Sequence, residues 1–183
     1  MTLTRAAADV TGDDPAPAKF GTVFGDRMAV AAYTDDEWQP MSVVATDSIS
    51  FGPATHALHY ASACFEGLKA HRHPDSTVRA FRADRHVERM RASAARLCLP
   101  VPSTELLTAM IAETIAANAE VAPEPPGSLY LRPTLVGTDH DIGAAASPSN
   151  SALLYVLASP VGEYLPPRQL RILVERDGAR TTP

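Results

Sequence analysis

The sequence is short of cysteine, of lysine and of long apolar runs, and the absence of each excludes a class of protein. The two cysteines, Cys64 and Cys98, lie among apolar neighbours, which favours two buried thiols in a reducing compartment over a disulfide framework. No run of about 18 apolar residues is present, so no transmembrane helix is expected. The N-terminus lacks the basic-then-apolar pattern of a secretory signal. We therefore expect a cytoplasmic protein.

Charge and composition exclude further classes of protein. The formal net charge is -5, which argues against a nucleic-acid-binding surface, and apolar residues make up 45% of the chain, enough for a folded core. The only lysines are Lys19 and Lys69, and arginines supply the rest of the positive charge. Because lysine is the side chain that forms Schiff bases, a lysine-dependent mechanism has only these two candidates within the sequence.

Motifs for metals and phosphates are also missing. His56 and His59 are three residues apart and His71 and His73 two apart, but no carboxylate or cysteine completes a ligand set at a familiar spacing. We expect no metal site. Neither common type of glycine-rich phosphate loop occurs. The Asp139-His140-Asp141 segment is expected to be a surface turn.

Periodicity and turn residues predict the order of the elements. Residues 1–18 are rich in Ala, Asp and Pro and are expected to form a disordered tail. The patterns predict strands over 28–33 and 41–45, a helix over 56–65, a hairpin of 68–73 and 77–81, helices over 83–97 and 103–117, and strands over 128–136, 152–159 and 170–175. This order favours an α+β fold with a mostly antiparallel sheet and helices packed on it.

Two residues of the predicted 128–136 strand can share a site. Tyr130 and Arg132 are two apart, so both side chains point to the same side of the sheet, and a hydroxyl and a guanidinium can enter one cavity. The alternative is an edge strand with a solvated face. Arg89, on the helix over 83–97, is open to a similar choice between an anion-binding side chain and a solvated one.

Several segments are informative through their order along the chain. They are Phe20-Gly21-Thr22-Val23-Phe24, Leu58-His59-Tyr60, Phe65-Glu66-Gly67-Leu68-Lys69-Ala70, Phe81-Arg82 with Arg89-Met90, Ser128-Leu129-Tyr130-Leu131-Arg132-Pro133, and Ser159-Pro160-Val161-Gly162 with Tyr164. Together these segments resemble the branched-chain-amino-acid aminotransferases of class IV, which have the type IV fold of pyridoxal phosphate enzymes. The resemblance implies the N-terminal small domain of the family over residues 19–165, followed at 166–183 by a last strand and the start of the interdomain linker.

The resemblance also implies roles for particular side chains. Arg89 matches the arginine that binds the cofactor phosphate, and Tyr130 and Arg132 match positions that receive the substrate carboxylate. The positions that match the pocket for the branched side chain are Phe24, Tyr60, Phe65 and Tyr164. Lys69 matches a cation that the family does not assign to the cofactor.

The family's Schiff-base lysine and the carboxylate that faces the pyridine nitrogen belong to the larger C-terminal domain, and the sequence stops before them. We therefore expect no catalytic lysine here and no transamination by this chain alone, and pyridoxal phosphate is a cofactor of the family that this half-site holds incompletely. Three interpretations remain open: a fragment of a transaminase, whether from a truncated gene, by design, or as one half of a split enzyme whose partner supplies the rest; a stand-alone domain reused for lysine-independent catalysis or for binding a small carboxylate; and a dimerisation scaffold.

Overall fold

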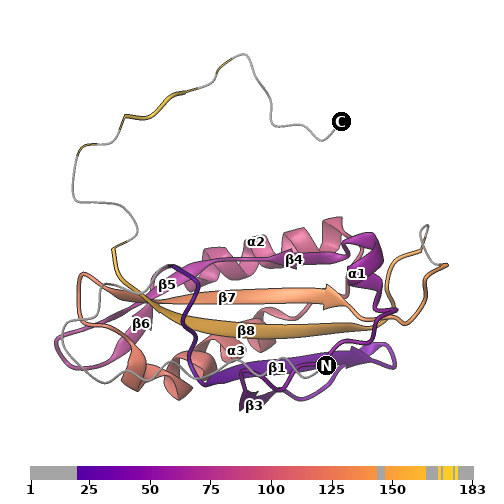
Figure 1. The fold of residues 1–183 in the computed structure, drawn as a ribbon, viewed down its shortest axis with the longest axis horizontal. Helices are drawn as coiled ribbons and strands as arrows, with labels where there is room; N and C mark the ends of the chain where they lie inside the picture. Colours follow the sequence, from indigo (N-terminus) through magenta and orange to yellow (C-terminus); the bar gives the residue numbers. More distant parts are fainter. Residues whose placement is uncertain (1–19, 144–146, 164–168, 170, 175, 177–183) are drawn as a thin grey trace.

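One sheet forms the centre of the computed structural model, which describes residues 20–143, 147–163, 169, 171–174 and 176. Its eight strands follow the order β2-β1-β8-β7-β5-β6, with β3 beside β1 and β4 beside β7, and every pairing is antiparallel (Figure 1). The strands are β1 Arg27–Thr34, β2 Glu37–Trp38, β3 Ser42–Ala45, β4 Ala63–Phe65, β5 Leu68–Arg72, β6 Val78–Ala80, β7 Ser128–Gly137 and β8 Ala152–Val161. The expected antiparallel α+β fold is confirmed.

Helices α2 Ala83–Arg96 and α3 Thr104–Ala117 cover one face of this sheet, and α3 is followed by the short 3-10 helix Ala119–Val121. The short helix α1 His56–Tyr60 lies at the end of the sheet, before β4 (Figure 1). Alternate residues of β7 and β8 are fully buried, among them Leu129, Leu131 and Leu154, and helices α2 and α3 contribute Met90 and Leu107 to the same core. Burial of a side chain of this size stabilises the fold by about 1.5–3 kcal/mol. The intervening residues of the strands point to the other face, where a site can form.

The local signals for helix α3 act as the sequence predicts. Ser103 is the N-cap, and its Oγ accepts a hydrogen bond from the backbone N–H of Leu106 at 3.0 Å. Helix α2 buries Val87, Met90 and Ala94, but Leu97, the last residue of the helix expected over 83–97, lies at the C-cap and is 46% exposed. The helix has ended by that point, so Leu97 no longer follows the helical spacing.

Three other expectations are wrong. The helix over 56–65 ends at Tyr60, because Ala61 adopts a left-handed conformation with φ 52° and residues 63–65 form β4 against β7. The thiol of Cys64 is buried as expected, whereas Cys98 is exposed beyond the end of α2. Within the strand expected over 170–175, the described residues 171–174 pair with no strand, and Ile172 is 82% exposed. The predicted tail lies outside the described residues.

Candidate active site

Strand β7 carries the central cation of the site on the face opposite the helices. The Nη2 atom of Arg132 donates a hydrogen bond to the Tyr130 hydroxyl at 3.0 Å, so the two side chains share a face as their spacing predicts. The guanidinium lies over the ring of Phe65, 4.4 Å from its centre. Its Nε atom is buried without a hydrogen-bond partner, and none of the acidic side chains that the structure describes forms an ion pair with Arg132. Arg132 therefore retains donors and a positive charge for a ligand.

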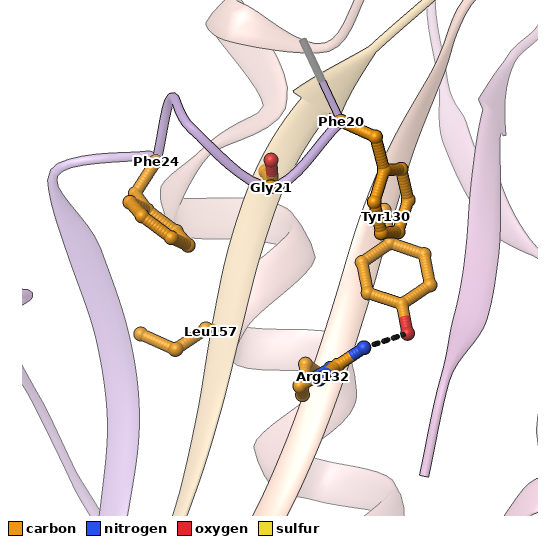
Figure 2. Close-up of a pocket in the computed structure, with 7 residues that line it drawn as sticks. Phe20, Gly21, Phe24, Tyr130, Arg132 and Leu157 are labelled. Atoms are coloured by element: carbon orange, nitrogen blue, oxygen red, sulfur yellow. Dashed lines mark hydrogen bonds between the residues drawn. The ribbon is translucent and has the colours of Figure 1, made fainter. Parts of the chain in front are cut away.

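A cavity of about 290 Å³ opens beside this pair. Figure 2 shows Phe20 and Tyr130 on one side and Phe24 and Leu157 on the other, with Arg132 between them. The cavity is lined by Phe20, Gly21, Phe24, Tyr130, Arg132, Leu157 and Ser159. Most of this lining is apolar, and the arginine is its one charged group. Such a cavity suits a ligand with an apolar body and one anionic end.

The N-terminal segment closes this cavity through long-range contacts. Phe20 meets the Tyr130 ring edge-on, with ring centres 4.9 Å apart. The Ser159 hydroxyl donates to the carbonyl oxygen of Val23 at 2.6 Å, and the Gly25 N–H donates to the carbonyl of Ala158 at 2.9 Å. These bonds fix the segment over β8.

A second hollow, of about 270 Å³, lies on the other side of Phe65. It is lined by Phe65, Glu66, Arg89, Ala92, Ser93 and Arg96. Arg89 donates from Nε to Oε2 of Glu66 at 2.8 Å, and its side chain is 63% exposed. Phe65, itself 61% exposed, borders this hollow and also supports the Arg132 guanidinium. Phe65 therefore contacts both the second hollow and the guanidinium that lines the first cavity.

The remaining residues expected in the site divide into two groups. Phe24 lines the first cavity, and Phe65 lines the second hollow. Tyr60 does not line either cavity; its hydroxyl donates to the backbone carbonyl of Ile142, and its ring lies 4.8 Å from that of His56. Tyr164 lies outside the described residues.

Several contributors to the site were not expected from the sequence. Leu157 and Ser159 on β8 reach the cavity only because β8 pairs with β7. Glu66 and Gly67 belong to a string that resembles the family, but no pattern assigned them a role. A side-chain carbon at position 67 would lie 2.2 Å from the Tyr130 hydroxyl, so glycine there makes room for the tyrosine.

The expected surface turn at Asp139 is more ordered than its sequence predicts. Burial alone would raise the pKa of the Asp139 carboxyl, but hydrogen bonds from the Ser151 hydroxyl and from the backbone N–H groups of Asn150 and Ser151 lower it below its ordinary value. Asp139 therefore organises the β7–β8 loop. No group of three His, Cys, Asp or Glu side chains that could hold a metal ion is found in the described ranges. Those ranges contain no helix long and apolar enough to cross a membrane.

Sequence comparison identifies the family to which this architecture, with a guanidinium and a tyrosine on the open face of an antiparallel sheet, belongs. The family model for amino-transferase class IV matches residues 63–182, and the chain belongs to this family. Among its curated relatives is the branched-chain-amino-acid aminotransferase of Dictyostelium discoideum, 40% identical over 149 residues, which cover 80% of this chain and 39% of that protein.

Solved structures agree with the sequence comparison. The branched-chain amino acid aminotransferase of the thermophilic archaeon Thermoproteus uzoniensis with norvaline matches with a TM-score of 0.58 and 26% identity, covering 76% of this chain and 42% of the other. A second branched-chain amino acid aminotransferase, complexed with 4-methylvaleric acid, matches with a TM-score of 0.57 and 26% identity, covering 71% and 39%. The same enzyme with pyridoxamine 5′-phosphate gives a TM-score of 0.60 and 26% identity, covering 76% and 41%. The chain spans less than half the length of the curated relatives it matches.

Proposed function

We propose that the chain supplies the small-domain half of the active site of a pyridoxal phosphate-dependent branched-chain-amino-acid transaminase. The observation that carries the proposal is Arg132, a partly buried cation that has no carboxylate partner among the described residues and sits beside Tyr130 in a largely apolar cavity. A partly buried arginine without a counter-ion binds a ligand carboxylate through charge-assisted hydrogen bonds. The phenyl and leucyl side chains around it accommodate the apolar part of the same ligand.

The second hollow fits the cofactor phosphate. Its lining includes two guanidinium groups, Arg89 and Arg96, and one carboxylate, Glu66, which pairs with Arg89, so positive charge remains to be neutralised. Arg96 forms no ion pair with any described residue, and the Ser93 hydroxyl is available to add a neutral donor. These residues would hold the phosphate, and the cofactor, when bound, would supply the electron sink that a proton transfer at the substrate's α-carbon requires. Phe65 would then separate the phosphate from the substrate carboxylate.

The proposal requires a lysine from elsewhere. Lys69 lies on β5 opposite Tyr130, at a position that resembles a cation the family does not use for the cofactor. We therefore infer that a lysine-bearing segment, either continuous with this chain or in a partner, completes the site, and that two copies associate. The two free cysteines are consistent with a reducing, cytoplasmic location.

The proposal is tested by comparing a carboxylic acid with its neutral amide. We expect the chain to bind 4-methylvaleric acid at least about tenfold more tightly than 4-methylvaleramide, since a hydrogen bond to a charged group contributes about 1.5–3 kcal/mol. The Arg132→Gln variant should lose this preference. Arg79→Gln is the matched control, because Arg79 is an exposed arginine of β6 that pairs with Asp75 in the neighbouring turn.

Nuclear magnetic resonance titration measures both affinities, even when they are millimolar. Equal affinity for acid and amide in the unaltered chain would contradict the proposal. The intact mass of the protein from its own organism adds a second test. A mass well above 19.5 kDa would show that a further segment is present, and a lysine within it would support the transaminase.

A further inference from the structure

We propose that Glu66 is a positioning residue that holds the Arg89 guanidinium in the orientation required to bind a phosphate dianion. This inference rests on the phosphate role of Arg89 in the proposed function and adds to it the residue that orients this arginine. Nothing in the spacing of the sequence singles out Glu66, because the carboxylate lies 23 residues from its partner.

The contacts between the two side chains engage one edge of the guanidinium. Oε2 of Glu66 lies 2.8 Å from Nε and 2.6 Å from Nη2 of Arg89. The Nη2 atom also lies 3.1 Å from Nδ1 of His86, which precedes Arg89 by about one turn of the same helix. Among the described residues, Nη1 makes no hydrogen bond or ion pair. The orientation therefore leaves the Nη1 edge of Arg89 unused at the second hollow.

Glu66 is itself held in place. Its side chain is 14% exposed, and Oε1 accepts a hydrogen bond from the backbone N–H of Gly67 at 3.1 Å. One carboxylate oxygen is thus bound to the backbone and the other to the arginine. Arg89 is as exposed as Arg85 on the same helix, at 63% against 60%, but Arg85 pairs with Glu88, a carboxylate that is 62% exposed and that solvent screens.

A fixed guanidinium binds an anion more tightly than a mobile one. A long arginine side chain that is free in solution must give up its rotational freedom when it binds a phosphate, whereas Arg89 has given up much of that freedom in the folded chain. The Glu66 carboxylate would repel a phosphate if it were unpaired, but Arg89 lies against its Oε2 atom. Its charge is therefore offset by the arginine, and Arg96 supplies a further cation to the hollow.

The test uses the 183-residue chain with ¹⁵N-labelled arginine. The Nε–H signal of Arg89, identified by its loss in Arg89→Lys, reports the ion pair directly through slow exchange with water. Titration with pyridoxamine 5′-phosphate and with pyridoxamine, which lacks only the phosphate, then gives the contribution of the phosphate to binding. The variants are Glu66→Gln, which removes the charge and keeps the shape, and Glu88→Gln, which removes the exposed carboxylate of the same helix.

We expect the unaltered chain and Glu88→Gln to show a protected Arg89 Nε–H and a preference for the phosphorylated ligand. Glu66→Gln should lose the protection, and its phosphate preference should fall on the order of tenfold. A phosphate preference that persists in Glu66→Gln and disappears in Arg89→Lys would overturn the role of Glu66 alone. No preference in the unaltered chain would overturn the phosphate role of Arg89, and the role of Glu66 with it. If Glu66→Gln does not fold, an unprotected Arg89 Nε–H in the unaltered chain still refutes the proposal.

Discussion

Replacement of Gly67 by alanine should weaken carboxylate binding while leaving the fold intact. The added carbon would lie 2.2 Å from the hydroxyl oxygen of Tyr130 and 2.9 Å from the ring carbon that bears it. Gly67 is not among the glycines at positive φ, so its backbone accepts an alanine. The side chain of Tyr130 must therefore move.

The size of that movement sets the expected loss. An ordinary carbon–oxygen contact is longer than 2.2 Å by about 1 Å, so the hydroxyl must shift by roughly that distance. The hydrogen bond from Arg132 then lengthens from 3.0 Å to about 4 Å, beyond the range of a hydrogen bond. Loss of a bond from a charged donor costs about 1.5–3 kcal/mol, which corresponds to roughly 10- to 150-fold weaker binding when the ligand needs Arg132 in this orientation.

The assay is a double-mutant cycle on the dissociation constant of 4-methylvaleric acid. Gly67→Ala should weaken binding in the unaltered background and have little effect in a Tyr130→Phe background, where the hydroxyl that meets the new methyl group is gone. The free energy of unfolding, measured in urea, should change by less than about 1 kcal/mol, since a tolerated Gly→Ala change acts mainly on the unfolded chain. Equal losses of affinity in both backgrounds would refute this reasoning.

Other predictions concern stability and thiol chemistry. Burial raises the pKa of the Cys64 thiol from 9.0 to about 11, so a disulfide reagent at pH 8 should modify the exposed Cys98 first. The buried neutral thiol stabilises the fold below pH 9, and this stabilisation is lost as the pH rises through 11. Because the pKa of Asp139 is lowered, its carboxylate stabilises the fold above the ordinary pKa of 3.8, and this stabilisation is lost at lower pH. Asp139→Asn should therefore destabilise the fold at pH 7, and its stability should converge with that of the unaltered chain in acid unfolding curves. Ser103→Ala should destabilise the fold by about 1 kcal/mol in urea, and an unchanged midpoint would exclude capping as its role.

Elements with local causes could be predicted from the sequence. Helix α3 follows from a cap and a first turn that are adjacent in the chain, and the shared direction of Tyr130 and Arg132 follows from the two-residue period of a strand. Neither depends on a distant partner. The class of fold followed from the order of such elements.

Elements that depend on distant partners could not be predicted from the sequence. Residues 63–65 carry a helix-like apolar spacing, yet Cys64 pairs with Leu135, and no local pattern encodes that pairing. An alanine, Ala61, adopts the left-handed conformation that ends α1 early, so the sequence lacks the glycine that usually signals such a helix end. The ion pair between Glu66 and Arg89 likewise joins a loop to a helix, and the Phe20 contact with Tyr130 joins the first described residue to a strand far along the chain.

The position of β8 between β1 and β7 also determines when the sheet can close during synthesis. The carbonyl of Val23, just before β1, accepts a hydrogen bond from the hydroxyl of Ser159, which is synthesised 136 residues later. At typical translation rates of about 5–20 residues per second, this delay is roughly 7–27 s. Throughout that interval the buried side of β1 that includes Ala29 and Ala31 has no β8 beside it. Nascent chains stalled before residue 152 should therefore recruit chaperones, and those extended well beyond residue 161 should release them.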